Sequence, residues 1–178
     1  MLYLLLFFTG ILPNTLNKVL YKLVKNIGFG KIGGNLRYAV IKRLAKECGN
    51  NIYIGPNVII VHIENLSIGN NVSIHANTYI DCTGTVTIGN DVSIAHDCSI
   101  ISFEHIYTDK NIPIRDQPLK KESIIISNNS WLGCKVCVLA GVKLGERMIC
   151  AAGSVICNSF ENGHAIIGGV PAKLIKQI

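Results

Sequence analysis

The sequence predicts an all-β solenoid, a parallel β-helix with a helical segment before it and one long external loop. The main observation is a period of six, because aliphatic residues recur at every sixth position within residues 54–156. Neither the period of a helix nor the strict alternation of an ordinary strand fits it. A six-residue unit cannot bury its apolar side alone, so three units form one triangular turn and successive turns stack. The positions are Ile68, Ile74, Ile80, Ile88, Ile94, Ile100, Ile126, Leu132, Val138, Leu144, Cys150 and Ile156.

A second, smaller inward-facing residue follows most of these positions four residues later. The period predicts that both sets point into the solenoid, with the large residues along its sides and the small ones at its corners. Met148 is the one bulky member of the second set. Its other members are Val58, Val72, Thr78, Val92, Cys98, Ser130, Val136, Val142 and Ser154.

Three interruptions of the period predict where the solenoid carries its insertions. The steps that begin at Ile60 and Ile80 are eight residues long, and the step that begins at Ile100 is twenty-six. Successive interruptions begin twenty residues apart, which is one eighteen-residue turn plus two inserted residues, so all three fall on the same corner. Insertions of a solenoid map to one side, often the binding side, and a long excursion in so compact a fold is usually functional. The longest insertion contains His105.

The part of the chain before the repeat predicts helices. Residues 1–12 are almost wholly apolar, but they are too few to span a bilayer and lack the basic start and cleavage site of a secretory signal. We expect an amphipathic helix between Pro13 and Gly28, and a second helix over about residues 36–48, ended by Gly49. These helices cap the open end of the solenoid, rest as a basic segment on an anionic membrane surface, or do both.

Composition indicates one domain with a continuous core and excludes a disordered chain, since 49% of the 178 residues are hydrophobic and 16% are charged. The net charge is +6. Seven cysteines without a signal peptide predict a reducing, cytoplasmic compartment, and Cys98 and Cys150 are expected to face inward as small apolar side chains. Cys134 and Cys137 form a CxxC pair, but its place in a repeat coil disfavours redox or zinc chemistry.

These patterns divide the chain into an N-terminal helical segment (1–50), a β-helix (51–160) and a C-terminal tail (161–178). The external loop is expected at 102–123, on the corner that carries all three interruptions.

Two segments resemble a known family. The segment WLGCKVCVLAGVKLGERMICAAGSVICNSFENGHAIIGGVPAK, residues 131–173, resembles the end of the hexapeptide-repeat acyltransferases of the galactoside and maltose O-acetyltransferase type. The segment TVTIGNDVSIAHDCSIISFEH resembles their approach to the catalytic histidine. The resemblance covers about residues 52–175. It implies a left-handed β-helix, a homotrimer, acetyl-CoA as the acyl donor, no metal, and active sites between subunits.

The resemblance also implies a set of residues for the donor. Trp131 matches the tryptophan that helps shape the transfer site, and Cys134 matches a residue whose main-chain N–H faces the acyl group. Ala152 and Gly153 fall in the stretch whose main chain binds the pantetheine arm. Lys173 lies in the tail that approaches the nucleotide end of coenzyme A.

The acceptor residues depart from the family pattern. Where sugar acetyltransferases of this type hold the acceptor with an asparagine and an aspartate, this chain has His75 and Thr83. Asn77 and Asp81 lie close by and are candidates to take over those contacts. We expect a sugar hydroxyl as the acceptor, on a bacterial cell-surface polysaccharide or on its lipid-linked precursor at the inner face of the cytoplasmic membrane. Serine and xenobiotic acceptors stay open on the same fold.

His105 matches the family's catalytic histidine, and the chemistry supports that role. A hydroxyl attacks a thioester readily only if a base removes its proton as the bond forms. A histidine with an ordinary pKa of about 6.5 is mostly neutral at pH 7 and can be that base. Main-chain N–H groups can stabilise the oxyanion, so a cysteine is acceptable at position 134. Glu104 is a candidate to orient His105.

Two functions of other classes stay open. A γ-class carbonic anhydrase shares this solenoid and binds zinc through three histidines, but it needs two of them in an H-x4-H pair, whereas His96 and His105 are nine residues apart. A non-catalytic, sugar-binding scaffold is the other alternative. We expect no nucleic-acid partner for this protein.

Overall fold

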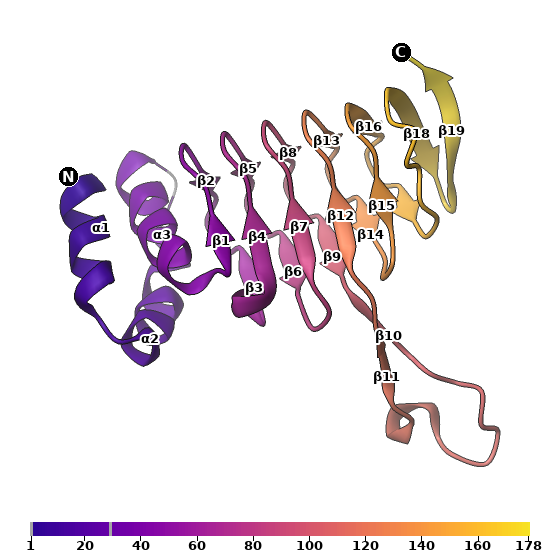
Figure 1. Cartoon of the computed structure of the whole chain (residues 1–178), viewed down its shortest axis with the longest axis horizontal. Coiled ribbons are helices and arrows are strands. Elements are labelled where there is room, and N and C mark those ends of the chain that lie inside the picture. Colours follow the sequence, from indigo (N-terminus) through magenta and orange to yellow (C-terminus); the bar gives the residue numbers. More distant parts are fainter. Residues whose placement is uncertain (1, 29) are drawn as a thin grey trace.

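The computed structural model describes residues 2–28 and 30–178 and shows an elongated three-sided solenoid. Three helices cover its N-terminal end, and a long hairpin projects from one corner (Figure 1). Within the described residues, no helix is both long and apolar enough to cross a membrane.

The helical cap consists of α1 (Leu2–Ile11), α2 (Asn14–Val24) and α3 (Lys31–Leu44). Both α1 and α2 pack against α3, and α3 packs against the first strands of the solenoid. The α1 helix is the outermost element (Figure 1). The buried guanidinium of Arg37 on α3 joins cap and solenoid, because its Nε donates a 2.8 Å hydrogen bond to the main-chain oxygen of Ile54.

The second helix lies earlier in the chain than its sequence pattern predicts. We expected about residues 36–48, whereas α3 begins at Lys31 and ends at Leu44. The next residues, Glu47 and Cys48, form a strand that pairs in parallel with Ser67 and Ile68. Residues 47 and 48, which the helix pattern includes, therefore form ladder hydrogen bonds of the solenoid instead of helical ones. Gly49 does not end a helix but lies at a corner, where a Cβ atom would clash with the main-chain oxygen of Gly69.

Three parallel sheets form the sides of the solenoid. Sheet 1 contains β1 (Glu47–Cys48), β4 (Leu66–Ile68), β7 (Val86–Ile88), β12 (Ile124–Ile126) and β15 (Lys143–Leu144). Sheet 2 contains β2 (Tyr53–Ile54), β5 (Ser73–Ile74), β8 (Ser93–Ile94), β13 (Trp131–Leu132), β16 (Met148–Cys150), β18 (Ala165–Gly169) and β19 (Ala172–Gln177). Sheet 3 contains β3 (Ile59–Val61), β6 (Tyr79–Asp81), β9 (Ser99–Ile101), β14 (Cys137–Val138) and β17 (Val155–Ile156).

The core confirms the six-residue period. Large residues of the first set, such as Ile74, Ile94 and Leu132, have no exposed surface. The smaller set is buried too, including Cys98 and the bulky Met148. Each turn lies on the next through in-register parallel pairing, so residues of the same type stack in columns along the solenoid.

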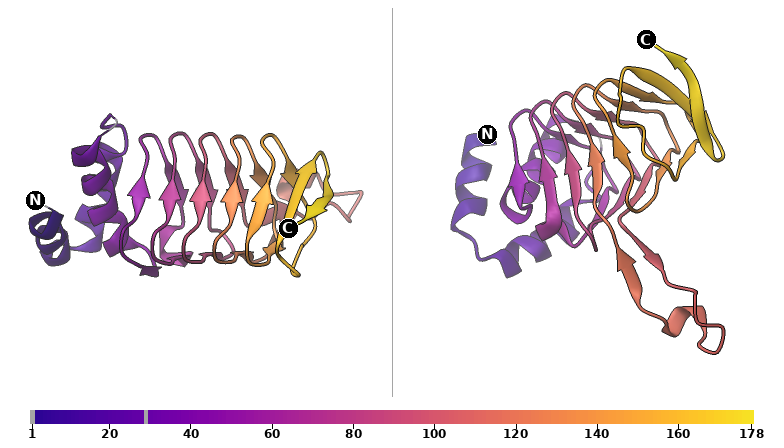
Figure 2. Two further views of the ribbon diagram at one scale, coloured as in Figure 1. Left: turned by 90° about the horizontal axis from the view of Figure 1, so that it is seen from above. Right: turned by 45° about the vertical axis from the view of Figure 1, so that its right-hand side comes forward.

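All three interruptions of the period fall on the corner between sheets 3 and 1, as predicted. After β3 the extra residues form a 3-10 turn (Ile63–Asn65), and after β6 they form a short loop. After β9 they form the hairpin of β10 (Phe103–His105) and β11 (Leu119–Lys121), with a 3-10 turn (Ile114–Asp116) near its tip. Both views of Figure 2 show the regular stack, and its right-hand view shows the hairpin leaving it. Residues 161–178 contain β18 and β19, an antiparallel pair that ends sheet 2.

Candidate functional site

His105 lies on the first strand of the hairpin, in register with Leu119 on the second strand. Its side chain is exposed, and its ring lies 6.4 Å from the ring of Phe103 in an edge-on arrangement. Phe103 and His105 share one side of the strand because side chains alternate along it. The histidine is therefore presented on an ordered strand and is free to meet another molecule.

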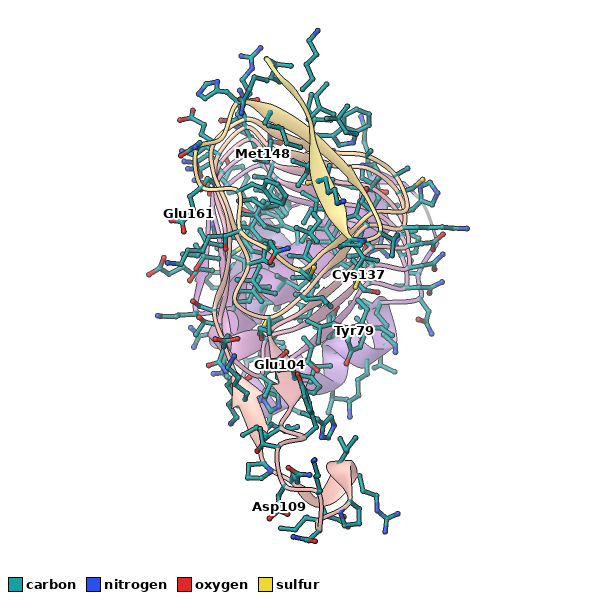
Figure 3. The ribbon with its side chains drawn as sticks, turned by 90° about the vertical axis from the view of Figure 1, so that its right-hand side faces the viewer. Tyr79, Glu104, Asp109, Cys137, Met148 and Glu161 are labelled. Carbon is teal, nitrogen blue, oxygen red and sulfur yellow. The ribbon has the colours of Figure 1, made fainter. Side chains whose placement is uncertain are left out.

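Glu104 does not orient His105. It points to the opposite side of the strand, and its carboxylate pairs with the Lys120 ammonium at 3.2 Å. Lys120 also pairs with Glu122 at 3.0 Å, so these exposed charges join the two strands of the hairpin. Figure 3 shows Glu104 near the root of the hairpin and Asp109 at its outer end.

The predicted donor residues gather around the corner between sheets 2 and 3. Trp131 on β13 is 53% exposed. Cys134 and Gly153 occupy this corner on consecutive turns, and the Gly153 N–H donates a 2.8 Å hydrogen bond to the main-chain oxygen of Cys134. Gly153 has a φ of +72°, and a Cβ atom there would meet nothing within 4 Å. We call the residues Trp131, Cys134, Ala152 and Gly153 the donor corner.

Two main-chain N–H groups of the donor corner are unpaired. Among the described residues, neither the Cys134 nor the Ala152 N–H has a protein acceptor. Gly133 explains why the turns lie so close, because a Cβ atom on it would come within 2.7 Å of the Ala152 nitrogen. Main-chain N–H groups are strong donors that seek a partner. An extended ligand with carbonyl acceptors, such as the pantetheine arm of coenzyme A, fits such a row of donors beside an exposed indole.

Lys173 lies apart from the donor corner on β19. Lys173 pairs with Gly168 of β18 in the antiparallel pair that ends sheet 2, and its side chain is exposed. It is free to meet the phosphates of a ligand that extends past the last turn.

The predicted acceptor residues do not form one group. Asp81 and Thr83 lie together at the root of the hairpin, where the Thr83 Oγ1 donates a 2.6 Å hydrogen bond to the Asp81 Oδ1. The Ser102 Oγ, which directly precedes the hairpin, donates 2.7 Å to the Asp81 main-chain oxygen. His75 and Asn77 lie instead on the corner between sheets 2 and 3, two turns before Cys134.

The side chains of His75 and Asn77 already contact other residues of the chain. The His75 ring lies 5.4 Å from the Tyr53 ring, and the Asn77 Oδ1 accepts a 3.2 Å hydrogen bond from Asn57. Asn77 also has a φ of 59°, which a side chain of its type tolerates. This backbone conformation explains an asparagine at position 77 even if the residue does not contact the acceptor substrate.

Sequence reasoning missed two residues of this region. Tyr79 completes the Asp81 group, since its hydroxyl donates 3.0 Å to the second carboxylate oxygen. Burial, and then the hydrogen bond to the Asp81 carboxylate and its charge, raise the pKa of Tyr79 above its ordinary value. Gln117 is buried within the hairpin. No signal in the sequence marks Gln117, because its burial appears only in the folded hairpin.

Within a single chain, His105 and the donor corner lie at different corners of the solenoid. The hairpin leaves from the corner between sheets 3 and 1, whereas the donor corner lies between sheets 2 and 3, so the width of sheet 3 separates the two corners. Figure 1 shows the hairpin on the side opposite β13 and β16. Among the described residues, no group of three or more histidine, cysteine or acidic side chains could hold a metal ion.

No family model matches the chain. Over 84 residues, 47% of this chain and 28% of the relative, it is 32% identical to a protein of Mycobacterium tuberculosis named as an acetyltransferase. Over 78 residues, 43% of this chain and 39% of the relative, it is 36% identical to a protein of Escherichia coli (strain K12) named as an O-acetyltransferase of lipopolysaccharide biosynthesis. Over 62 residues, 35% of this chain and 26% of the relative, it is 39% identical to the 2,3,4,5-tetrahydropyridine-2,6-dicarboxylate N-acetyltransferase of Enterococcus faecalis. The matches thus span well under half of each relative's length.

Solved structures share the fold across nearly the whole chain. A maltose O-acetyltransferase from Clostridium difficile 630 superposes with a TM-score of 0.82 at 21% identity, covering 93% of this chain and 86% of that one. A hexapeptide-repeat acetyltransferase from Vibrio cholerae, complexed with acetyl-CoA, superposes with a TM-score of 0.79 at 23% identity, covering 90% and 85%. This likeness confirms the left-handed parallel β-helix. The chain is thus similar to hexapeptide-repeat acetyltransferases in fold over nearly its whole length, and similar to acetyltransferases in sequence over less than half of it.

Proposed function

We propose that the protein is an acetyltransferase that moves an acetyl group from acetyl-CoA to a sugar hydroxyl. The observation that carries the proposal is the pair of unpaired N–H groups at Cys134 and Ala152 beside the exposed Trp131. The acetyl-CoA complex of the similar Vibrio cholerae protein supports this donor. The lipopolysaccharide assignment of the similar Escherichia coli protein supports a cell-surface polysaccharide or its precursor as the acceptor, and we place the reaction in the cytoplasm.

The residues of the chain have separate roles in this reaction. Bound acetyl-CoA supplies a thioester-activated acetyl group. His105 removes the proton from the acceptor hydroxyl as it attacks, and returns that proton to the departing sulfur. The Cys134 N–H donates to the oxygen on which negative charge develops. Lys173 contacts the phosphates at the far end of the donor.

A second copy of the chain completes the site. His105 projects on the hairpin from the corner between sheets 3 and 1, and the donor corner lies between sheets 2 and 3, so in our proposal the hairpin of a neighbouring copy brings the histidine to the donor corner. In a homotrimer around a three-fold axis, each copy supplies its hairpin to one neighbour and its donor corner to the other. Asp81 and Thr83 at the hairpin root then hold the acceptor near His105, while His75 and Asn77 line the neighbouring side.

An N-acetyltransferase is the second candidate, because the similar Enterococcus faecalis protein acts on nitrogen by its name. A neutral amine and a hydroxyl would both need a base in the place of His105. A panel of amino sugars, sugars and serine, each followed by coenzyme A release, separates these acceptors.

Donor binding can be tested without the acceptor. Trp131 is the chain's only tryptophan, so its fluorescence reports on the donor corner alone. We expect a saturable change on addition of acetyl-CoA, a weaker affinity in Lys173→Ala, and no change in either protein with acetate. A flat titration of the folded protein would remove the proposed donor.

Catalysis is tested by His105→Ala, with His164→Asn as the matched control on another exposed histidine. We expect His105→Ala to keep acetyl-CoA affinity and oligomeric state, but to lose roughly 10²-fold or more in the rate of coenzyme A release. The control should keep the wild-type rate. Full activity of His105→Ala would exclude this histidine as the base.

A further inference from the structure

The outer side of the helical cap carries large apolar residues that none of the described residues covers. On α1 they are Tyr3, Leu4, Phe7, Phe8 and Ile11, each between 57% and 89% exposed. Their spacing of one, four, five and eight residues places them on one side of the helix. The other side packs against α3, where the Thr9 hydroxyl donates to the main-chain oxygen of Ala39 at 3.3 Å. Figures 1 and 2 show α1 at the extreme end of the molecule.

The α2 helix adds a second exposed apolar stripe. Leu16, Val19 and Leu23 are all more than half exposed, at a spacing of three and four residues. The buried side of the same helix is different, since it consists of Asn17, Tyr21 and Val24. The apolar stripe is therefore not needed for packing the cap on the solenoid. Isolated exposed apolar residues are common, but contiguous sets of this size usually mark an interaction site.

Positive charge is concentrated in the same part of the chain. Residues 1–46 contain eight lysine and arginine residues and no aspartate or glutamate, which leaves nine basic and eleven acidic residues for the other 132. The whole net charge of +6 thus comes from the cap, and the solenoid is slightly negative. Among the described residues, the cap makes a single ion pair with a carboxylate, between Lys18 and Glu64 at 3.6 Å.

Most of these charges are free for a partner. Arg37 is buried and Lys42 donates to the main-chain oxygens of Cys48 and Gly49, so both act inside the fold. The remaining basic residues are exposed or half-buried on the surface of the cap: Lys18, Lys22, Lys25, Lys31, Arg43 and Lys46.

We propose that this face of the cap docks on an anionic lipid surface. The exposed sides of α1 and α2 insert at the level of the headgroups, and the surrounding lysines contact the lipid phosphates. At ten residues α1 is far too short to cross the bilayer, so the contact is peripheral. The chemistry disfavours a second copy of this face as the occupant, because two caps without acidic residues repel each other. It also disfavours a nucleic acid as the occupant, because the five exposed apolar side chains of α1 would have no apolar surface to contact there.

The inference goes beyond the proposed reaction and can fail independently of it. The test is co-sedimentation of the full chain with vesicles of phosphatidylcholine, with and without phosphatidylglycerol. We expect binding only to the anionic vesicles and a decrease at high salt, with each surface lysine contributing roughly fivefold to the partition coefficient. Failure to bind anionic vesicles at low salt would overturn the proposal.

Two pairs of variants identify the residues involved. Phe7→Asn with Phe8→Asn should weaken vesicle binding by roughly tenfold or more, whereas Ile175→Asn, an equally exposed site at the opposite end, should not. Lys22→Gln with Lys25→Gln should weaken vesicle binding and lower its salt dependence, whereas Lys110→Gln with Lys121→Gln on the hairpin should leave both unchanged.

Circular dichroism and the midpoint of thermal unfolding check that each variant is folded. Wild-type vesicle binding by the phenylalanine variant would overturn the proposal. So would a change in its oligomeric state by light scattering with unchanged vesicle binding, because the face would then be a subunit interface.

Discussion

Gln117 donates a 2.8 Å hydrogen bond from its Nε2 to the main-chain oxygen of Asp109 and so closes the outer end of the hairpin. The same nitrogen donates 2.8 Å to the oxygen of Ile112, and the side-chain oxygen accepts 3.2 Å from the Asp109 N–H. One buried amide thus satisfies three main-chain groups of a loop that is otherwise exposed. The loop that carries His105 is held in shape by a residue outside the proposed chemistry.

Gln117→Ala is expected to loosen the hairpin without unfolding the solenoid. Three main-chain groups lose their partner, so hydrogen exchange should accelerate at residues 106–118 while the midpoint of thermal unfolding stays nearly unchanged. Loss of the position of His105 should lower the rate of coenzyme A release by roughly tenfold to a hundredfold. The matched control is Gln177→Ala, the only other glutamine, which is exposed at the end of β19. An unchanged exchange pattern in Gln117→Ala would show that the amide does not hold the loop.

The six-residue period predicted the solenoid because burial in this fold is a local, repeating property. Ile74 and Cys98 could be assigned to the interior from their register alone, and the corner that carries the hairpin followed from counting residues. The end of the second helix could not, because Glu47 and Cys48 pair with Ser67 and Ile68, twenty residues further along the chain.

Parts of the candidate site were beyond the sequence for a similar reason. The unpaired N–H of Cys134 is visible only when neighbouring turns are in place. The contact between Tyr79 and Asp81 depends on how the carboxylate is shared with Thr83, which no spacing specifies. The residue types could be picked out by resemblance, but their placement at two different corners of one chain required the structure.

Cysteine reactivity should divide the seven thiols by burial. Burial raises the pKa of Cys98 to about 11 and that of Cys150 to about 12, and it raises the pKa of Cys82 to about 12, where the charges of Asp81 and Glu64 add to it. Only the thiolate reacts with alkylating reagents, so at pH 8 these three are both enclosed and almost wholly protonated. We expect the exposed Cys157 to be alkylated first in the folded protein.

The measurement is a time course of alkylation with iodoacetamide, mapped by mass spectrometry. Unfolding in denaturant serves as the control, because all seven thiols should then react at similar rates. Early labelling of Cys98 in the native protein would mean that the turn around it opens readily.

Gly133→Ala is expected to disturb the donor corner directly. An added Cβ atom would lie 2.7 Å from the Ala152 nitrogen and 2.9 Å from the Cys150 oxygen, and both are main-chain atoms that cannot rotate away. The turns must separate, which should lower the free energy of unfolding by about 1–3 kcal/mol. The same shift moves the Ala152 N–H away from that of Cys134, so the affinity for acetyl-CoA, followed through Trp131, should fall as well.

Gly34→Ala in α3 is the matched control for that change. Its Cβ atom would meet the Tyr53 ring at 3.6 Å, an ordinary contact, and alanine is favoured over glycine within a helix by up to about 1 kcal/mol. We therefore expect the two glycine substitutions to change the stability in opposite directions, with donor affinity unchanged in Gly34→Ala. Urea unfolding of both variants has to be compared at one protein concentration, because assembly into an oligomer contributes to the measured stability. Wild-type stability and wild-type affinity in Gly133→Ala would show that the corner yields easily and that its close packing does not set the positions of the two N–H groups.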